Sequence, residues 1–175
     1  MKPIHRIIAT QAAGAAVLTA LLLEGCVGYQ LGSMLPRDIR TVFVPPFENR
    51  TGEPDIEDEL TRATIAEIQK DGSLIISEAA TADAVLKVTL RQFELVPLAY
   101  TKEKTTLVDE YRMRIHARVV LERTLDGSIV YQNPDVIGET EFLISGDMSS
   151  AKRSALPDVA KDLAHQIVEK IVEAW

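Results

Sequence analysis

The feature that most constrains the fold of this chain is the stretch 111–122, in which apolar and polar side chains alternate. Tyr111, Met113 and the following odd-numbered positions are apolar or aromatic, whereas the even-numbered positions are charged or polar except Val120. Successive side chains of a β-strand point to opposite faces of the sheet, so this pattern predicts a strand. One face of that strand is expected to be buried, and the other is expected to be open to water.

Four further segments have the character of strands. One of them repeats the alternation, and another returns along the chain after a turn at Asp126-Gly127, with a break expected near Pro134 and Gly138. Two shorter segments are apolar runs bounded by polar residues or proline. In chain order, the predicted strands are residues 39–44, 74–77, 83–96, 111–122 and 128–142.

Two segments have the apolar periodicity of amphipathic helices. The first is expected to run from Pro54 to about Lys70, because proline suits the first helical position and Gly72 can end a helix. The second follows a loop at residues 145–150 and runs to the C-terminus with one wide apolar stripe. Pro157 either lies in its first turn or kinks a helix that starts earlier.

The predicted elements therefore follow the order β-α-β-β-β-β-α. Each helix has one apolar side and the long strands have one apolar face, so the simplest packing places both helices against the same face of the sheet. We expect an α+β fold, a two-layer sandwich with a mostly antiparallel sheet of four to five strands and two helices on one face. Residues 39–175 are expected to form this single domain, with the other face of the sheet polar and open.

The N-terminus has the pattern of a lipoprotein signal peptide. A short positive segment precedes a mostly apolar run over residues 7–23, and the Leu-Glu-Gly-Cys that follows resembles the recognition site of the lipoprotein signal peptidase. Residues 1–25 are thus expected to be cleaved, Cys26 to carry the lipid, and residues 26–38 to form a lipidated tether. The alternative is an uncleaved anchor helix that ends at a free cysteine.

Charge and cysteine content exclude some classes of protein. The formal net charge is −7, and an acidic domain without a long basic run is a poor binder of nucleic acid. The single cysteine excludes an internal disulfide.

In well-studied lipoproteins, aspartate after the lipidated cysteine is associated with retention in the inner membrane. This chain has Val27 at that position, which by resemblance implies sorting to the outer membrane.

Short motifs that resemble one protein family are spread over nearly the whole chain after the signal peptide. They are Cys26-Val27-Gly28-Tyr29-Gln30-Leu31, Leu35-Pro36, Phe47-Glu48-Asn49-Arg50-Thr51, Glu53-Pro54-Asp55-Ile56-Glu57, Asp83-Ala84-Val85-Leu86, Tyr111-Arg112-Met113, and the last helix from Leu163 to Trp175. Their order and spacing are similar to those of the lipopolysaccharide-assembly lipoproteins of the LptE type. The inserted Val27 and the acidic Glu24 before the cleavage site depart from the family pattern.

The resemblance implies a place and a partner for the protein. Proteins of this type are lipid-anchored at the periplasmic face of the outer membrane. They plug and help to assemble an LptD-type β-barrel translocon, which delivers lipopolysaccharide to the outer leaflet. They bind lipopolysaccharide, catalyse no covalent change and carry no cofactor.

Basic side chains are the main chemical feature of the expected open face. The set comprises Arg112, Arg114 and Arg118, with His116 between them, and Lys87 and Arg91 on the neighbouring predicted strand. Arginine forks match phosphate oxygens, so this set is a candidate for binding the headgroup of lipopolysaccharide. The alternative is a solvated face on which the arginines pair with Glu122, Glu139 or Glu141 across strands. The same face can also rest against the wall of the barrel partner.

Lys102 and Lys104 are further candidates for contact with lipopolysaccharide. They lie in the polar connection between two predicted strands, where we expect a hairpin tip. A loop tip is a suitable contact point for a lipid or a partner protein, although a solvated turn accounts for these lysines as well.

No motif of a catalytic, metal or cofactor site is present in the sequence. The acidic cluster at residues 53–59 lacks the spacing of a calcium loop and suits the N-terminus of a helix. We therefore expect a protein that is not an enzyme. The main alternative function is an envelope scaffold or activator lipoprotein for a peptidoglycan synthase or a secretion pore. Those families share the loop after the first strand but usually continue with more alternating strands and helices.

Overall fold

The computed structural model describes residues 38–100, 108–144 and 146–173, and these belong to one structural unit. The predicted signal peptide, Cys26 and nearly all of the tether lie outside the described residues, as do Lys102 and Lys104. Eight elements are present in the described part of the chain. In order they are β1 (Thr41–Phe43), β2 (Glu48–Asn49), α2 (Glu57–Asp71), β3 (Ile75–Ile76), β4 (Ala84–Tyr100), β5 (Val108–Arg123), β6 (Ile129–Leu143) and α3 (Met148–Glu173).

The strands form one mixed sheet in the order β3-β1-β4-β5-β6, with the short β2 also paired to β4. The long strands β4, β5 and β6 are antiparallel, as expected, but β1, β2 and β3 pair in parallel. The parallel pairs arise because α2 connects β1 and β2 to β3, and a helical crossover returns the chain in the same direction. The expected order of elements is confirmed, with β2 as an addition that raises the sheet to six strands.

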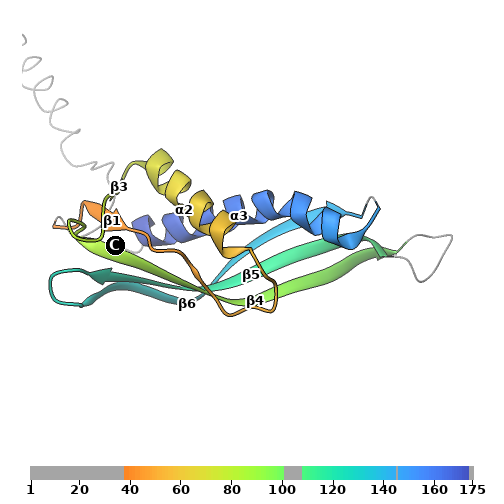
Figure 1. Cartoon of the computed structure of the whole chain (residues 1–175), viewed down its shortest axis with the longest axis horizontal. Helices are drawn as coiled ribbons and strands as arrows, with labels where there is room; N and C mark the ends of the chain where they lie inside the picture. The colour runs from red at the N-terminus through yellow and green to blue at the C-terminus, as the bar shows by residue number, and fades with distance from the viewer. Residues whose placement is uncertain (1–37, 101–107, 145, 174–175) are drawn as a thin grey trace, which may run out of the picture. The chain divides into compact units, whose positions relative to one another are not determined.

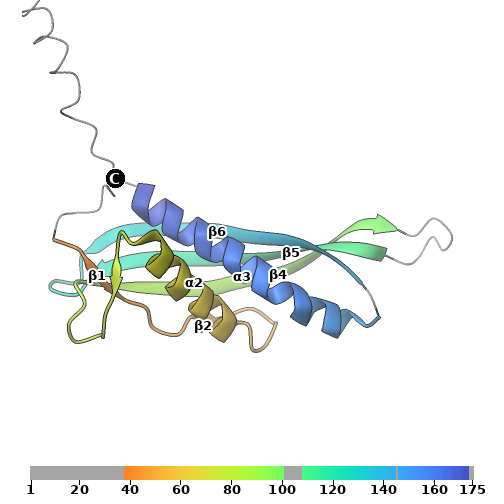
Figure 2. The same cartoon turned by 90° about the horizontal axis from the view of Figure 1, so that it is seen from above.

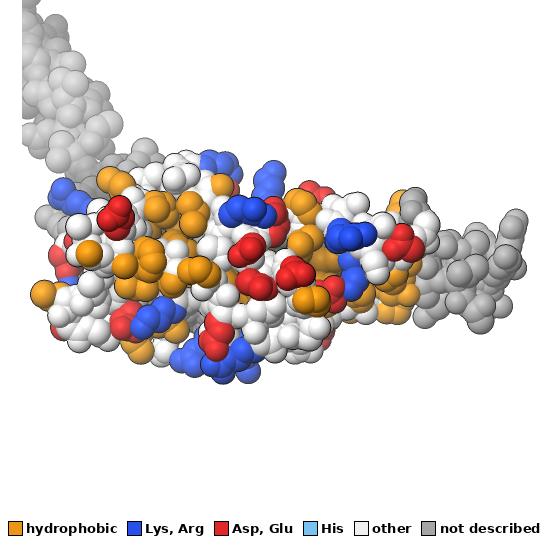
Figure 3. Space-filling view, viewed as in Figure 1, with side chains coloured by type: hydrophobic (Ala, Val, Ile, Leu, Met, Phe, Trp, Pro, Cys, Tyr) orange, Lys and Arg blue, Asp and Glu red, His pale blue; other side chains and the backbone are white. Residues whose placement is uncertain are grey.

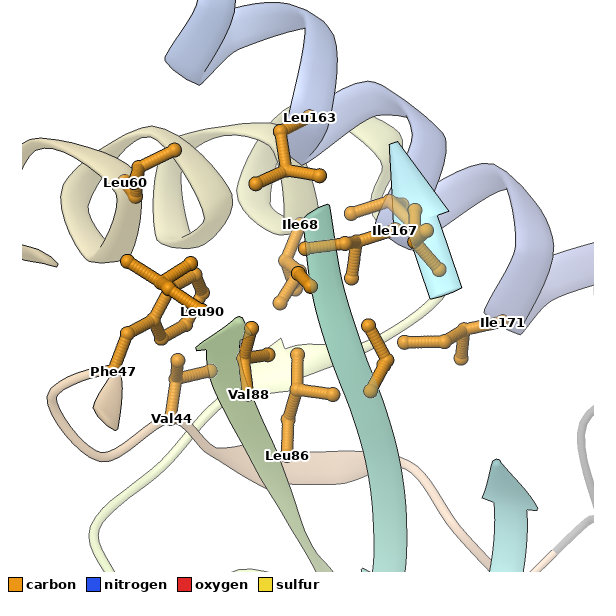
Figure 4. Close-up of a cluster of buried hydrophobic side chains, with 14 of the residues drawn as sticks. Val44, Phe47, Leu60, Ile68, Leu86, Val88, Leu90, Leu163, Ile167 and Ile171 are labelled. Atoms are coloured by element: carbon orange, nitrogen blue, oxygen red, sulfur yellow. The ribbon is translucent and has the colours of Figure 1, made fainter. Parts of the chain in front are cut away.

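Both helices cover the same face of this sheet, which confirms the two-layer arrangement. Figures 1 and 2 show α2 and α3 side by side above the strands, with the opposite face bare of helices. The predicted alternation also holds, because Met113, Ile115 and Val119 of β5 are buried and point toward the helices. Figure 4 shows the resulting core, in which side chains of β4 meet Leu60 of α2 and Ile167 of α3.

Of the register shifts in the antiparallel sheet, two bulges lie at the same level. In β4 the register passes from Leu90 opposite Ala117 to Gln92 opposite His116, so that Arg91 is an extra residue. In β6 an extra residue falls at Pro134-Asp135, where the sequence predicts a break. The predicted irregularity at Gly138 is wrong, because the pairing with β5 is regular there. Gly138 instead allows α3 to pack closely against β6, because a Cβ at this position would clash with Leu163.

The first helix begins later than the sequence predicts. Pro54 lies in a turn, and α2 starts at Glu57. The reason is Asp55, whose positive φ of 61° is a left-handed conformation that an α-helix does not accommodate. The side-chain amide of Asn49 holds this loop by donating to the Glu53 carbonyl oxygen (2.9 Å) and the Glu57 carboxylate (2.8 Å).

The second helix begins earlier than predicted, within the expected loop. Asp147 precedes α3, and its carboxylate accepts a hydrogen bond from the backbone N–H of Ser150 at 2.9 Å, as a helix cap does. Pro157 therefore lies inside the helix, which is the second of the two positions considered for it. Of the helices described, none is long and apolar enough to cross a membrane.

Asp83 joins the first strands of the sheet through its carboxylate. One oxygen accepts hydrogen bonds from the backbone N–H groups of Arg40 (3.0 Å) and Thr41 (2.9 Å) and from the Thr41 hydroxyl (2.8 Å). These bonds favour the charged form, and the backbone N–H of Arg40 makes the largest contribution. They hold the pKa of Asp83 below its ordinary value of 3.8.

Replacing this carboxylate by an amide (Asp83→Asn) is expected to lower the free energy of unfolding by about 1–3 kcal/mol at neutral pH, because hydrogen bonds to a charged acceptor are lost. The folded pKa lies below the unfolded one, so the stabilisation is present above about pH 4 and disappears as the pH falls through the folded pKa. Urea unfolding across this range checks the prediction. A difference between the two proteins that stays constant down to about pH 2 would contradict it, and Asp158→Asn, an exposed site on α3, is the control.

Candidate ligand-binding face

The open face of the sheet is the side away from α2 and α3, and it carries the charged side chains of β4, β5 and β6. Figure 3 shows Lys and Arg side chains gathered at the lower edge of the domain, on this side of the sheet. Five of the basic residues predicted from the sequence lie on this face. They are Lys87, Arg91, Arg112, Arg114 and Arg118.

Three of these five cations are paired with glutamates on the next strand. Arg112 contacts Glu141 at 2.5 Å and Arg114 contacts Glu139 at 3.0 Å, because the register places each arginine directly opposite its glutamate. The hydrogen bond from Arg112 to Glu141 raises the pKa of that arginine. The third pair joins Lys87 of β4 to Glu122 of β5 at 2.8 Å. Glu122, Glu139 and Glu141 are the same carboxylates that were expected to pair with basic side chains if this face is simply solvated.

His116 lies between two carboxylates on the same face. Its Nδ1 is 2.9 Å from an Asp135 oxygen, and its Nε2 is 3.9 Å from a Glu94 oxygen. The ring is mostly buried, and Nε2 has no hydrogen-bond partner among the described residues. Both nitrogens of the His116 ring thus face carboxylates of the neighbouring strands β4 and β6.

Arg91 and Arg118 differ from the other cations because neither forms an ion pair with any residue that the structure describes. Arg91 reaches over β5 and donates a hydrogen bond from its guanidinium to the Pro134 carbonyl oxygen at 3.2 Å. Both arginines line a hollow of about 620 Å³ on the open face. We call it the arginine hollow, and its lining residues are Arg50, Thr89, Arg91, Arg118, Gln132 and Pro134.

Arg50 is the one arginine of the hollow that the sequence did not single out. Residues 48–53 read as a loop, and only the parallel pairing of β2 with β4 brings Arg50 beside Arg91. Glu48 contacts the Arg50 guanidinium at 2.8 Å and accepts a hydrogen bond from the Thr89 hydroxyl at 3.1 Å. The hydrogen bond from Arg50 is the main reason why the pKa of Glu48 is lowered. No short-range sequence signal could have found this contact, because it depends on which strands become neighbours.

A second groove, of about 470 Å³, lies between the loop before α2, the start of α3 and the far half of β4 and β5. Lys152 forms an ion pair with Glu53 there, and its ammonium lies 5.7 Å from the centre of the Phe93 ring. The acidic cluster at 53–59 extends from this loop into the first turn of α2. Within the described ranges, no group of three or more His, Cys, Asp or Glu side chains is arranged to hold a metal ion.

The ion pairs of the open face are expected to add little stability. In a double-mutant cycle with Arg114→Gln and Glu139→Gln, we expect a coupling of about 0.2–1 kcal/mol, because both side chains are partly exposed to water. The coupling should shrink further when the salt concentration is raised, since salt screens exposed charges. Urea unfolding of the four proteins measures it. A coupling of several kcal/mol, insensitive to salt, would mean that this pair is a fixed structural contact.

Three solved structures of other bacterial proteins share the fold at low sequence identity. Rare lipoprotein B from Shewanella oneidensis is 14% identical, with a TM-score of 0.51 over 77% of this chain and 96% of that chain. Uncharacterized lipoprotein B from Nitrosomonas europaea is 15% identical, with a TM-score of 0.52 over 83% and 91% of the two chains. Protein XCC0632 from Xanthomonas campestris is 12% identical, with a TM-score of 0.53 over 79% and 88%. At these identities the likeness establishes the fold alone.

The family assignment comes from the sequence. No curated protein matches the chain. The family model described as "LptE: Lipopolysaccharide-assembly" matches residues 39–171, which is nearly the whole domain and well over half of the chain. The resemblance read from the motifs of the sequence is thereby confirmed, and the chain belongs to the LptE family of lipopolysaccharide-assembly proteins.

Proposed function

We propose that this protein is anchored through the lipid on Cys26 to the periplasmic face of the outer membrane. There it partners and plugs an LptD-type β-barrel translocon and helps to assemble lipopolysaccharide into the outer leaflet. The observation that carries this proposal is the family match over residues 39–171. The signal-peptide pattern that ends at Cys26 supports the anchor.

The proposed role is one of binding and positioning, without covalent chemistry. The open face supports it, because a wide polar sheet surface suits an extended ligand. The cations proposed as the main contacts with lipopolysaccharide are Arg91 and Arg118, which form no ion pair with a described residue of this face. Lys87, Arg112 and Arg114 are already paired with glutamates and are proposed to contribute little. Lys102 and Lys104 are proposed as further contacts.

Depletion of the protein in its host tests the proposal. We expect the LptD-type barrel to co-purify with the native lipoprotein in mild detergent. We also expect surface lipopolysaccharide to fall when the protein is depleted, with recovery on re-expression. The barrel should be misassembled in the depleted cells, which is visible as altered mobility in semi-native electrophoresis.

The same experiment separates the main alternative. If the barrel assembles and lipopolysaccharide reaches the surface normally without this protein, the assembly role is wrong. Co-purification of a peptidoglycan synthase or a secretion pore in place of the barrel would then favour a scaffold or activator. An unrelated outer-membrane lipoprotein, depleted in parallel, controls for general damage to the envelope.

A further inference from the structure

We propose that the arginine hollow is a binding site for a phosphate group on an anionic lipid headgroup. The inference rests on the proposed function, since lipopolysaccharide is a phosphorylated lipid that this protein would meet. It adds a defined subsite on the open face and a new residue, Arg50, which directly follows β2.

Two bulges build the hollow around Arg118. In β4 the extra residue is Arg91, directly after Leu90. In β6 the extra residue falls at Pro134-Asp135, opposite Arg118. Bulges bend a strand and redirect a side chain, and they are frequent beside functional sites. Arg91 and Pro134 thus flank Arg118 from β4 and β6, the two strands on either side of β5, and all three residues line the hollow.

The β2 segment brings the third guanidinium to the same place. The backbone N–H of Arg50 donates to the Leu90 carbonyl oxygen at 2.9 Å, which fixes Arg50 one residue away from the bulged Arg91. Glu48 holds the Arg50 side chain from the other side and is itself held by Thr89. Arg50 is therefore oriented before a ligand arrives, which lowers the entropy lost on binding.

The lining of the hollow is rich in hydrogen-bond donors and contains no carboxylate side chain. The guanidinium groups of Arg91 and Arg118 and the Gln132 amide can donate, and the six lining residues include no aspartate or glutamate. The Thr89 hydroxyl already donates to Glu48, and Arg50 adds only the guanidinium N–H groups that Glu48 does not contact. A phosphate group offers only acceptor oxygens and negative charge, so it complements this lining, and arginine binds it with two parallel hydrogen bonds. A cationic or neutral apolar ligand would leave these donors without partners.

The remaining cations of the open face do not share this arrangement. Arg112 and Arg114 already contact glutamates, so an arriving phosphate would compete with a bound carboxylate. Arg91 and Arg118 have no such competitor among the described residues. This difference gives a matched control, because both pairs lie on the same face and their neutralisation removes the same charge.

The test compares the mature lipoprotein in detergent with two double variants, Arg91→Gln/Arg118→Gln and the control Arg112→Gln/Arg114→Gln. The probes are purified lipopolysaccharide, the same material after enzymatic dephosphorylation, and phosphatidylglycerol in phosphatidylcholine vesicles. We expect Arg91→Gln/Arg118→Gln to weaken binding of intact lipopolysaccharide by about 10-fold or more, as the loss of charge-assisted hydrogen bonds implies. The control Arg112→Gln/Arg114→Gln should change binding of intact lipopolysaccharide by less than about 3-fold, because exposed ion pairs contribute little free energy.

Dephosphorylation should weaken wild-type binding by a similar factor and leave Arg91→Gln/Arg118→Gln without further loss. Weaker binding of phosphatidylglycerol vesicles by that variant would mean that the site accepts any lipid phosphate, and unchanged vesicle binding would mean that it selects lipopolysaccharide. Either result supports a phosphate subsite. The proposal is overturned if both double variants lose binding equally, or if Arg91→Gln/Arg118→Gln still distinguishes intact from dephosphorylated lipopolysaccharide.

Circular dichroism and urea unfolding establish that each variant is folded, so that a loss of binding is read as a loss of contacts. The proposed function fails separately from this inference. Co-purification of the barrel depends on the whole protein in its membrane, whereas the phosphate preference is measured on the purified chain. A preserved phosphate preference with no barrel partner would keep the site and reject the assembly role.

Discussion

The substitution Gly138→Ala is expected to lower the free energy of unfolding by about 3 kcal/mol, the upper range for overpacking a core contact. A Cβ at this position would lie 2.4 Å from the Cβ of Leu163 and 2.7 Å from its Cα and backbone nitrogen. Backbone atoms of a helix cannot move aside as a side-chain tip can, so α3 would have to shift away from β6. Such a shift would also strain the hydrogen bond from the Glu139 N–H to the Asp162 carboxylate, which is 2.8 Å long.

Urea unfolding followed by circular dichroism measures this effect. The matched control is Gly52→Ala, because a Cβ at Gly52 meets no atom within 4 Å. We expect that control to change stability only slightly. If the two substitutions destabilise the domain equally, α3 does not approach β6 as closely as the structure has it.

When the protein is produced in large excess over its proposed barrel partner, replacing the leader and lipidation site is expected to release that excess from the membrane. The change exchanges residues 1–26 for the cleavable signal peptide of a soluble periplasmic protein, so that no acyl chain is attached. Acyl chains bind a bilayer with about 0.8 kcal/mol per buried CH₂ group, and more than one chain is needed for stable anchoring. Without them the excess protein should appear in the soluble periplasmic extract instead of the outer-membrane fraction.

The control for this change is a second leader exchange that keeps a lipoprotein signal peptide and its cysteine. That protein should stay in the membrane fraction and incorporate labelled palmitate. The prediction of lipidation at Cys26 would be wrong if the unaltered protein carried no lipid, or if the excess of the non-lipidated form remained in the outer-membrane fraction after a high-salt wash.

The faces of the long strands were predictable because their cause is local. Successive side chains of a strand point to opposite sides, so the alternation at 111–122 placed Ile115 in the core and Arg114 on the open face before any packing was known. The two helices and their common side of the sheet follow for the same reason, since each has a single apolar stripe that must be buried.

The boundaries of the helices were predicted less well. The start of α2 moved from Pro54 to Glu57 because Asp55 adopts a left-handed conformation. The side chain of Asn49 holds the loop around Asp55 by contacting Glu53 before it and Glu57 after it, and helix propensities do not describe such contacts. The start of α3 moved in the opposite direction, because Asp147 caps a helix that was expected to begin after Ser150.

The candidate site divides in the same way between local and distant causes. The sequence alone determined that Arg91 and Arg118 lie on the open side of their strands, and that the chain belongs to the LptE family. Only the tertiary structure decided that Arg112 and Arg114 are paired with glutamates while Arg50 joins the other two arginines. Which carboxylate neutralises which cation depends on strand register and bulges. These are set by contacts between residues far apart in the chain, whereas the direction of a side chain depends only on its own strand.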